Sequence, residues 1–269
     1  MKTYRDRKRR VLGQHFLNSP GVLKKIVEAV APAADDLVVE IGPGKGAMTF
    51  LLAERAGRVV AIEKDSEMLP FLKEKAVPNL TIIEGDVLDC DFAGLLSTYG
   101  EPHQKAILAG NLPYSISTPL LFKLLEDRAE FARCVFLVQK EVSERICARP
   151  GCKAYSPLSI LLQIRFAAAI RFAVHPGSFT PPPRVESALV TLDARPEPLV
   201  PIANEQRFVK FLKSAFRQRR KTLWNNLAAA GWPAAAMERA FAEHELAASI
   251  RPEQVEIAKF ASLLDRLGH

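Results

Sequence analysis

Residues 37–46 read LVVEIGPGKG, an aliphatic run that leads directly into a loop with three glycines. Such a run, followed by glycine and proline, is typical of a buried strand that ends in a tight turn. Because glycine has no Cβ and tolerates positive φ, the loop lets the backbone approach a ligand closely. A helix is expected over residues 46–56, and its N-terminus would favour an anionic group. Gly42, Gly44 and Ala47 also satisfy the dinucleotide pattern G-x-G-x-x-A, and a plain strand-to-helix turn is the alternative.

Four more short apolar runs follow along the chain, at 59–63, 80–84, 106–110 and 134–138. Helices are expected between or after them, at 65–76, 118–127, 139–149 and 156–165. Strands that alternate with helices in this way predict βαβ units, a parallel sheet and an α/β fold class. Two later runs, at 170–174 and 187–192, are expected to add an edge hairpin to the sheet.

A proline-rich stretch, ARPEPLVP at 194–201, separates this part of the chain from a second part. Beyond it the sequence shows no strand pattern, and helices are expected at 204–216, 219–230, 233–243 and 253–267. The domain boundary is therefore placed near residue 198. The expected organisation is a Rossmann-like domain at 1–198, which begins with a basic segment at 1–18, and a small all-helical domain at 199–269.

Charge and composition narrow the function classes. The 269 residues contain 37 Lys and Arg against 30 Asp and Glu, and the net charge of +7 favours a polyanionic partner such as nucleic acid. No apolar segment reaches the roughly 18 residues that a membrane span needs, and the basic start lacks a signal-peptide core. The four cysteines show no C-x-x-C pair. Membrane, secreted and zinc-finger proteins are excluded, and a cytoplasmic protein without a metal is expected.

Two carboxylates follow the glycine loop at the ends of the next two strands. Glu63 closes the strand at 59–63, where it can accept hydrogen bonds from both ribose hydroxyls of an adenosine-type ligand. Asp86 follows the strand at 80–84, and its carboxylate can accept a hydrogen bond from the exocyclic amine of the same ligand's adenine. The alternatives are a solvated Glu63 and an Asp86 that merely caps a turn. A nicotinamide enzyme and an S-adenosylmethionine enzyme both fit these positions.

The residues at the end of the fourth strand favour the S-adenosylmethionine enzyme. This strand ends in Gly110-Asn111-Leu112-Pro113-Tyr114, in which an Asn side-chain oxygen and a backbone carbonyl next to proline can accept from one amino group. Tyr114 can stack on the base that bears this amine. Hydride transfer needs no such set, whereas methylation of a conjugated amine benefits from two acceptors. The alternative is an ordinary Asn-Pro turn with Tyr114 filling the core.

With these motifs the chain resembles class I S-adenosylmethionine methyltransferases that modify adenine N6. It resembles most closely the ribosomal RNA adenine dimethyltransferase family, in its bacterial 16S branch. Further matching stretches are LGQHFL at 12–17, QKEV at 139–142, FTPPPRV at 179–185 and AFRQRRKTL at 215–223. The resemblance covers the chain from about residue 10 to residue 227.

The resemblance implies S-adenosylmethionine as methyl donor and S-adenosylhomocysteine as product. Its donor-binding positions are held here by His15, Leu17, Gly42, Gly44, Glu63, Asp86, Val87 and Asn111. Its catalytic, target-side positions are Asn111, Leu112, Pro113, Tyr114 and Phe179, with Tyr114 and Phe179 on opposite faces of the target adenine. The segment that contains His15 and Leu17 is expected to fold over the donor like a lid.

The implied substrate is a pair of adjacent adenosines in the 3′-terminal hairpin of 16S rRNA, within an assembling 30S subunit. Two basic runs can contact its phosphates, although a solvated charged face is the alternative. The candidate RNA-binding residues are Arg9, Arg10, Arg217, Arg219, Arg220 and Lys221. A monomer is expected, and no general base is required.

Four other functions compete with this interpretation. The nearest one is a related 23S rRNA methyltransferase that gives macrolide resistance. Another is a binding protein, an assembly factor that gates 30S maturation and in which catalysis is secondary. A DNA adenine methyltransferase is disfavoured because its motif usually has proline in place of Leu112. A nicotinamide dehydrogenase is disfavoured by the Asn111–Tyr114 loop.

Overall fold

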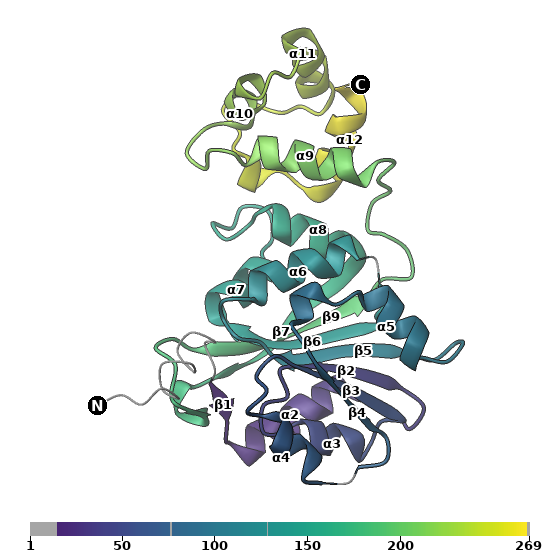
Figure 1. The fold of residues 1–269 in the computed structure, drawn as a ribbon. Coiled ribbons are helices and arrows are strands. Elements are labelled where there is room, and N and C mark those ends of the chain that lie inside the picture. The colour runs from purple at the N-terminus through teal and green to yellow at the C-terminus, as the bar shows by residue number, and fades with distance from the viewer. Residues whose placement is uncertain (1–14, 76, 128, 268–269) are drawn as a thin grey trace. The chain divides into compact units, whose positions relative to one another are not determined.

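The computed structural model describes residues 15–267 apart from 76 and 128, and the chain divides into two compact units (Figure 1). The first unit contains the described residues up to Ser143 together with Ala167–Ala194. The second contains Glu144–Phe166 and the described residues from Arg195 onward.

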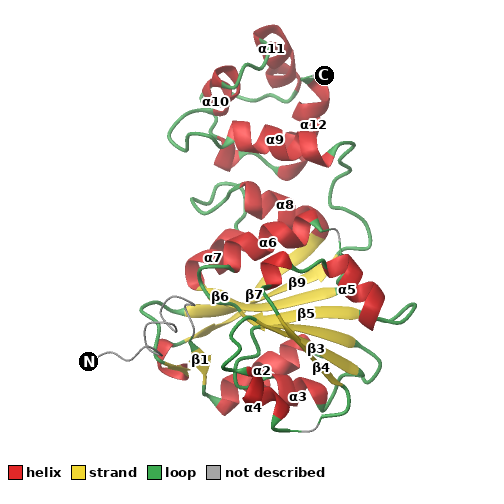
Figure 2. Ribbon diagram, in the orientation of Figure 1, coloured by secondary structure: helices red, strands yellow, loops and turns green. Residues whose placement is uncertain are grey.

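A seven-stranded sheet runs through the first unit in the order β4-β3-β2-β5-β6-β9-β7 (Figure 2). Its strands are β2 (Leu37–Ile41), β3 (Arg58–Glu63), β4 (Leu80–Glu84), β5 (Ala106–Asn111), β6 (Arg133–Gln139), β7 (Phe166–Val174) and β9 (Ser187–Ala194). The strands from β4 to β6 in this order are all parallel, as the alternation of strands and helices predicted. β9 pairs antiparallel with β6, and β7 forms the edge beside β9.

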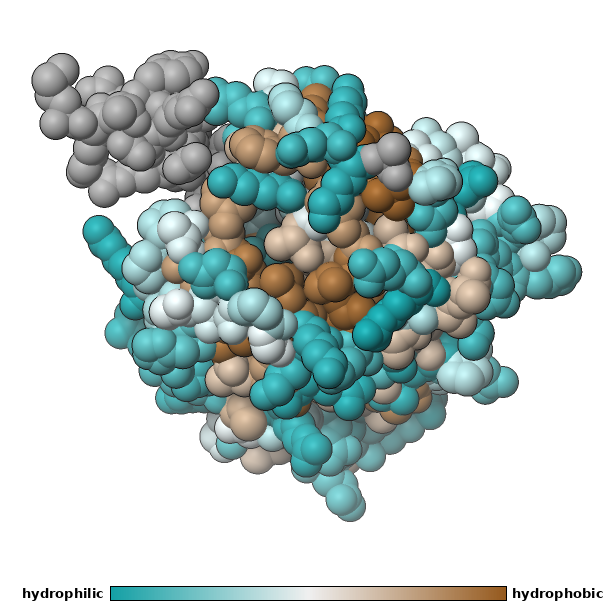
Figure 3. Space-filling model, turned by 90° about the horizontal axis from the view of Figure 1, so that it is seen from below, coloured by the Kyte–Doolittle hydropathy of each residue, from teal (hydrophilic) through white to brown (hydrophobic). Residues whose placement is uncertain are grey.

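The central strands are buried on both faces. Leu37, Val38, Val39 and Ile41 of β2 are each at most 2% exposed, so the strand is a continuous apolar run without alternation. Helices α2 (Pro20–Val30), α3 (Thr49–Ala53) and α4 (Leu69–Lys73) cover one face, and α5 (Phe92–Tyr99) and α6 (Ser117–Glu126) cover the other (Figure 1). From the side of α2, α3 and α4 the surface is largely hydrophilic around a central group of apolar residues (Figure 3).

A separate two-stranded sheet joins the start of the described chain to the loop after β7. β1 (Phe16–Leu17) pairs antiparallel with β8 (Phe179–Thr180). The pairing continues beyond the strands, because the Asn18 N–H donates to the Ser178 carbonyl at 2.9 Å. Both short strands contribute residues to the site described below.

Helices make up the second unit. They are α8 (Pro157–Arg165), α9 (Glu205–Ala215), α10 (Leu223–Ala229), α11 (Ala234–Glu243) and α12 (Ile257–Arg266), while α7 (Lys140–Ile146) spans the junction between the units. Phe208, Phe211 and Phe260 are at most 1% exposed and form an aromatic core. The ring of Trp232 packs edge-on against Phe211, with ring centroids 5.4 Å apart.

The structure places Glu144–Phe166 in the second unit, whereas the expected boundary near residue 198 left this segment in the first. Ile160 and Ile164 are buried in the same hydrophobic cluster as the C-terminal helices. Arg165 Nη2 donates to both carboxylate oxygens of Glu205, at 2.8 and 2.9 Å. A proline-rich stretch marks where the chain leaves the sheet, but its composition does not show which core the preceding helix joins.

Candidate active site

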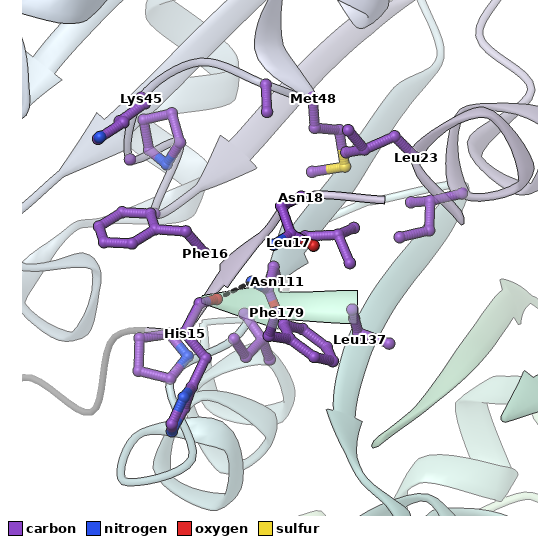
Figure 4. Close-up of a pocket in the computed structure, with 18 of the residues that line it drawn as sticks. His15, Phe16, Leu17, Asn18, Leu23, Lys45, Met48, Asn111, Leu137 and Phe179 are labelled. Carbon is purple, nitrogen blue, oxygen red and sulfur yellow. Dashed lines mark hydrogen bonds between the residues drawn. The ribbon is translucent and has the colours of Figure 1, made fainter. Parts of the chain in front are cut away.

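A cavity of about 360 Å³ opens in the first unit at the carboxyl ends of β2, β3 and β5 (Figure 4). Ten of the residues that the sequence singled out line it: His15, Leu17, Gly42, Gly44, Glu63, Asn111, Leu112, Pro113, Tyr114 and Phe179. In open α/β sheets ligands bind at this edge, outside the carboxyl ends of the strands. The structure therefore gathers most of the predicted donor-side and target-side residues around one space.

The loop after β2 requires its glycines. Gly42 and Gly44 have φ angles of +64° and +57°, a left-handed region that residues with a Cβ rarely adopt. A Cβ on Gly44 would also lie 3.0 Å from the ring of Phe16. The Gly44 N–H donates to Glu63 Oε2 at 2.9 Å, which ties the loop to the end of β3.

Glu63 is only 4% exposed, and burial raises the pKa of its carboxyl. Its Oε2 accepts from the Gly44 N–H, and its Oε1 accepts from the Asp65 N–H at 2.7 Å. Each carboxylate oxygen has a further lone pair, so the group retains acceptor capacity for two hydroxyls. The solvated alternative for Glu63 is wrong, because the side chain is buried and doubly hydrogen-bonded.

Asp86 and Val87 do not line the cavity. Asp86 caps the short 3-10 turn η1 (Val87–Asp89), because its Oδ1 accepts from the Leu88 N–H at 3.0 Å. Its Oδ2 accepts from Lys64 Nζ at 2.5 Å. Partial burial raises the pKa of Asp86, but these two hydrogen bonds outweigh it and the pKa lies below its ordinary value. The turn-capping role is thus present, and contact of Asp86 and Val87 with a donor adenine remains a prediction.

Asn111, at the end of β5, is held by the chain segment that covers the cavity. Its Nδ2 donates to the carbonyl oxygen of His15 at 2.9 Å (Figure 4). This bond fixes the orientation of the amide, and none of the described residues donates to Asn111 Oδ1. The side chain thus keeps one acceptor available.

The loop after Asn111 leaves a second acceptor available. The Leu112 N–H donates to the Leu137 carbonyl at 3.0 Å, while no group in the described part of the chain donates to the Leu112 carbonyl oxygen. The neighbouring Pro113 carbonyl accepts from the Ile116 N–H and from Ser117 Oγ, both at 3.1 Å. The geometry therefore distinguishes the carbonyl of Leu112, which is available, from that of Pro113, which is used within the loop.

The two aromatic residues predicted on the target side, Tyr114 and Phe179, line the same cavity, as does Phe16. The Tyr114 hydroxyl lies 2.9 Å from Ser187 Oγ, and the ring of His15 lies 5.4 Å from that of Tyr114 at an interplanar angle of 34°. Phe179, on β8, is 3% exposed. The interpretation of Tyr114 as core filling alone is wrong, because this residue lines the cavity together with Phe179.

The segment from His15 to Asn18 is fastened to the loop around β8. His15 Nδ1 lies 2.7 Å from the Pro181 carbonyl oxygen, and Asn18 Nδ2 donates to Thr180 Oγ1 at 2.6 Å. Both segments line the cavity (Figure 4). This arrangement is consistent with the lid that the sequence predicted for residues 15–17.

Glu40 lines the site although the sequence patterns did not single it out. It lines the cavity, is 1% exposed, and its Oε2 finds no partner among the described residues. Burial raises the pKa of Glu40 to about 8; Thr49 lowers it and the charge of Glu63 raises it further. The available signal was a single carboxylate inside an aliphatic strand. A cationic ligand group in the cavity would satisfy this buried carboxyl.

The basic residues Arg217, Arg219, Arg220 and Lys221 are exposed in the second unit, in the loop between α9 and α10. Asn226 braces this loop, because it accepts from the Gln218 N–H at 3.0 Å and donates to the Gln218 carbonyl at 3.1 Å. Arg9 and Arg10 lie outside the described residues.

The parallel sheet, its glycine loop, the buried Glu63 and the acceptor pair after β5 define a Rossmann-like class I methyltransferase domain, followed by a helical C-terminal region. The profile of the family described as ribosomal RNA adenine dimethylase matches residues 5–268. The chain belongs to this family.

Individual relatives agree with this assignment. The chain is 43% identical over 261 residues to the ribosomal RNA small subunit methyltransferase A of Geobacter sulfurreducens, covering 96% of this chain and 94% of that one. Identity to the protein of the same name from Latilactobacillus sakei is 40%, covering 100% and 92%. Among solved structures, a dimethyladenosine transferase from Plasmodium falciparum is 27% identical with a TM-score of 0.75, covering 93% of this chain and 96% of that one. The 23S rRNA methyltransferase ErmE shares the fold at 24% identity and a TM-score of 0.72, covering 94% and 100%.

Residues 15–267, apart from 76 and 128, contain neither a candidate membrane span nor a candidate metal cluster. No helix in this part of the chain has both the length and the apolar character that a bilayer span requires. Within the same residues, no three His, Cys, Asp or Glu side chains are grouped so that they would hold a metal ion.

The pKa of Glu40 makes stability depend on pH. The ordinary value is 4.5 and the folded value is about 8, so between them the folded protein keeps a proton that the unfolded chain has released. The free energy of unfolding contributed by this group is therefore largest below about pH 4.5 and falls as the pH rises towards 8. We expect Glu40→Gln to remove this fall in thermal melts of the donor-free protein over that range.

The matched control is Asp36→Asn, a carboxyl 5% exposed that accepts from the Ala33 N–H outside the cavity. In this variant the fall that Glu40 causes between pH 4.5 and about 8 should remain, because Glu40 itself is unchanged. Parallel curves of melting temperature against pH for wild type and Glu40→Gln would contradict the raised pKa of Glu40.

Proposed function

We propose that this protein transfers methyl groups from S-adenosylmethionine to N6 of two adjacent adenosines in the 3′-terminal hairpin of 16S rRNA, within an assembling 30S subunit. The observation that carries the proposal is the pair of available acceptors after β5, Asn111 Oδ1 and the Leu112 carbonyl, on the cavity beside the glycine loop. Family membership and the small-subunit relatives support the RNA target. Such a protein works in the cytoplasm, where ribosomal subunits assemble.

The donor side fits the residues that line the cavity. Gly42 and Gly44 leave room for the methionine part, and Glu63 has the acceptor capacity for two ribose hydroxyls. The orphaned Oε2 of the buried Glu40 suits a cationic group of the donor. S-adenosylmethionine, when bound, supplies a methyl group on a sulfonium, which is a strong electrophile.

The target side holds an amine. Asn111 Oδ1 and the Leu112 carbonyl accept its two N–H groups, which favours the geometry in which the nitrogen lone pair leaves conjugation with the adenine ring. The amine is neutral before transfer, so its proton can pass to water afterwards without a general base. The rate then comes chiefly from the alignment of nucleophile, methyl and sulfur.

A second methylation at the same nitrogen is compatible with this site. After the first transfer the amine keeps one N–H, and one of the two acceptors suffices to hold it. Trapping of N6-monomethyladenosine as the only product after exhaustive reaction would overturn this account.

The target adenine can reach the site only after it has left the base stack of the RNA. An adenine paired or stacked in RNA cannot enter the cavity, so it has to be splayed out, and aromatic contacts from Tyr114 and Phe179 offset part of the unstacking cost. The exposed cations from Arg217 to Lys221, with Arg9 and Arg10 outside the described residues, are the proposed phosphate contacts. A monomer suffices for this function.

The substrate assignment is tested with 30S particles that lack these methyl groups. Purified protein is incubated with S-adenosylmethionine and either the particle or a naked 23S fragment, and digested nucleosides are identified by mass spectrometry. We expect N6,N6-dimethyladenosine with the 30S particle alone. Product on the 23S fragment instead would assign the macrolide-resistance branch. Intact donor binding without product on either RNA would favour the assembly-factor alternative.

The role of Asn111 is tested by substitution. We expect Asn111→Ala to abolish methyl transfer, because one acceptor and the bond to the His15 carbonyl are lost together. Donor affinity measured by calorimetry should stay within about tenfold, since Gly42, Gly44 and Glu63 are untouched.

Asn79→Ala is the matched control for this variant. Asn79 Nδ2 also donates to backbone carbonyls, those of Ala53 and Ala56 at 2.9 Å, but the residue does not line the cavity. Its turnover at saturating substrate should be near that of wild type. Normal turnover of Asn111→Ala at saturation, with donor binding lost, would count against the proposed role.

A further inference from the structure

The hydroxyl of Tyr114 has a single partner among the described residues, and that partner belongs to a strand that does not neighbour β5. Tyr114 Oη lies 2.9 Å from Oγ of Ser187, the first residue of β9. Tyr114 follows β5, and β6 lies between β5 and β9 in the sheet. The bond thus reaches across one strand and connects the acceptor loop to β9.

Ser187 is fixed in place by the ladder around it. It pairs with Gln139 at the end of β6, and the next backbone bond runs from the Lys140 N–H to the Glu186 carbonyl at 3.0 Å. The side chains of these two residues also form an ion pair, with Lys140 Nζ 2.8 Å from Glu186 Oε2. Ser187 itself is 1% exposed, so its hydroxyl is held at one position by a strand and not by a loop.

The Tyr114 ring needs such an anchor. It sits in a loop, and a Tyr side chain rotates about two torsions unless its ring is packed or its hydroxyl is bound. The ring of His15 contacts one part of it at a tilt of 34°. Ser187 holds the opposite, hydroxyl end. Together the two contacts define the plane of the ring.

We propose that Ser187 is a positioning residue that holds the Tyr114 ring in the plane on which the target adenine stacks. The proposal rests on the proposed function, in which Tyr114 contacts the target base. A fixed ring lowers the ordering cost of each encounter with a splayed base. Loss of the Ser187 hydroxyl frees the ring. The kcat/KM toward the RNA substrate then falls, while the affinity for S-adenosylmethionine is unchanged.

A double-mutant cycle tests this route of action. Ser187→Ala, Tyr114→Phe and the double variant are compared for kcat/KM toward the RNA substrate and for the dissociation constant of S-adenosylmethionine. We expect each single variant to lose about three- to tenfold in kcat/KM, which corresponds to one hydrogen bond. The double variant should be no worse than the poorer single variant, and donor affinity should be unchanged throughout.

Two outcomes of this cycle would overturn the proposal. One is wild-type kcat/KM for Ser187→Ala. The other is an equal further loss when Ser187→Ala is added to Tyr114→Phe, because Ser187 would then act through something other than the tyrosine hydroxyl.

Control variants separate positioning from folding. Ser143→Ala removes another buried serine hydroxyl, which is 0% exposed and donates to the Lys140 carbonyl at 2.6 Å. It should lower stability as Ser187→Ala does, but leave kcat/KM near the wild-type value. Ser187→Thr keeps the hydroxyl and should restore most of the activity; a loss as large as that of Ser187→Ala would contradict the proposal.

A spectroscopic measurement tests the contact independently of activity. Burial raises the pKa of Tyr114, while its hydrogen bond with Ser187 lowers it. In protein labelled with fluorotyrosine, we expect Ser187→Ala to move the Tyr114 resonance and to raise its titration midpoint. An unmoved resonance would refute the contact. Failure of the wild type to methylate any adenosine would refute the proposed function. The shift of the Tyr114 resonance would still show whether Tyr114 and Ser187 are in contact.

Discussion

The register of the parallel strands is the constraint on which the site depends. Ile41 of β2 lies opposite Ile62 of β3 on one side and Gly110 of β5 on the other. All three strands therefore end at the same height, and the residues that follow them meet at one edge of the sheet. The glycine loop, Glu63 and Asn111 are neighbours for this reason. A one-residue slip of β5 would turn Asn111 to the other face.

Register alone does not fix loop side chains, and a second set of contacts does so. The β1–β8 pair brings His15 to Asn111, and β9 brings Ser187 to Tyr114. Asn111, Leu112 and Tyr114 of the acceptor loop thus each have a partner that is itself held in a β ladder or beside one. Because of these contacts, a loop can present its acceptors at fixed positions. Methyl transfer needs such fixed positions when its rate comes from the alignment of the reacting groups.

Sequence patterns predicted the parts whose signals are local. The parallel strands were predicted to within one residue, because buried aliphatic runs between glycines and prolines have few alternatives. Seven of the predicted site residues lie at the carboxyl ends of β2, β3 and β5, and they line one cavity because motifs at strand ends converge in a parallel sheet. Helices α2 and α5 were missed, although α2 begins with the favourable pair Ser19-Pro20.

The remainder depends on distant contacts that no local pattern encodes. The β1–β8 pair joins Phe16 to Thr180, and two-residue strands carry no periodicity. Ser187 becomes relevant only because β9 inserts beside β6, and Glu40 only because it is buried beneath the cavity. The same limit applies to Glu144–Phe166, whose helix α8 packs with a core formed by residues beyond 200.

In the proposed function, one edge of the sheet presents the donor and an N6 amine to each other. The most direct test of this arrangement is a crystal structure with S-adenosylhomocysteine and an RNA hairpin that carries the target adenosines. We expect the ribose hydroxyls on Glu63 and the target amine within hydrogen-bond distance of Asn111 Oδ1 and the Leu112 carbonyl. A target amine held by other groups, or an Asn111 amide that presents Nδ2 to it, would refute the proposed function of this edge.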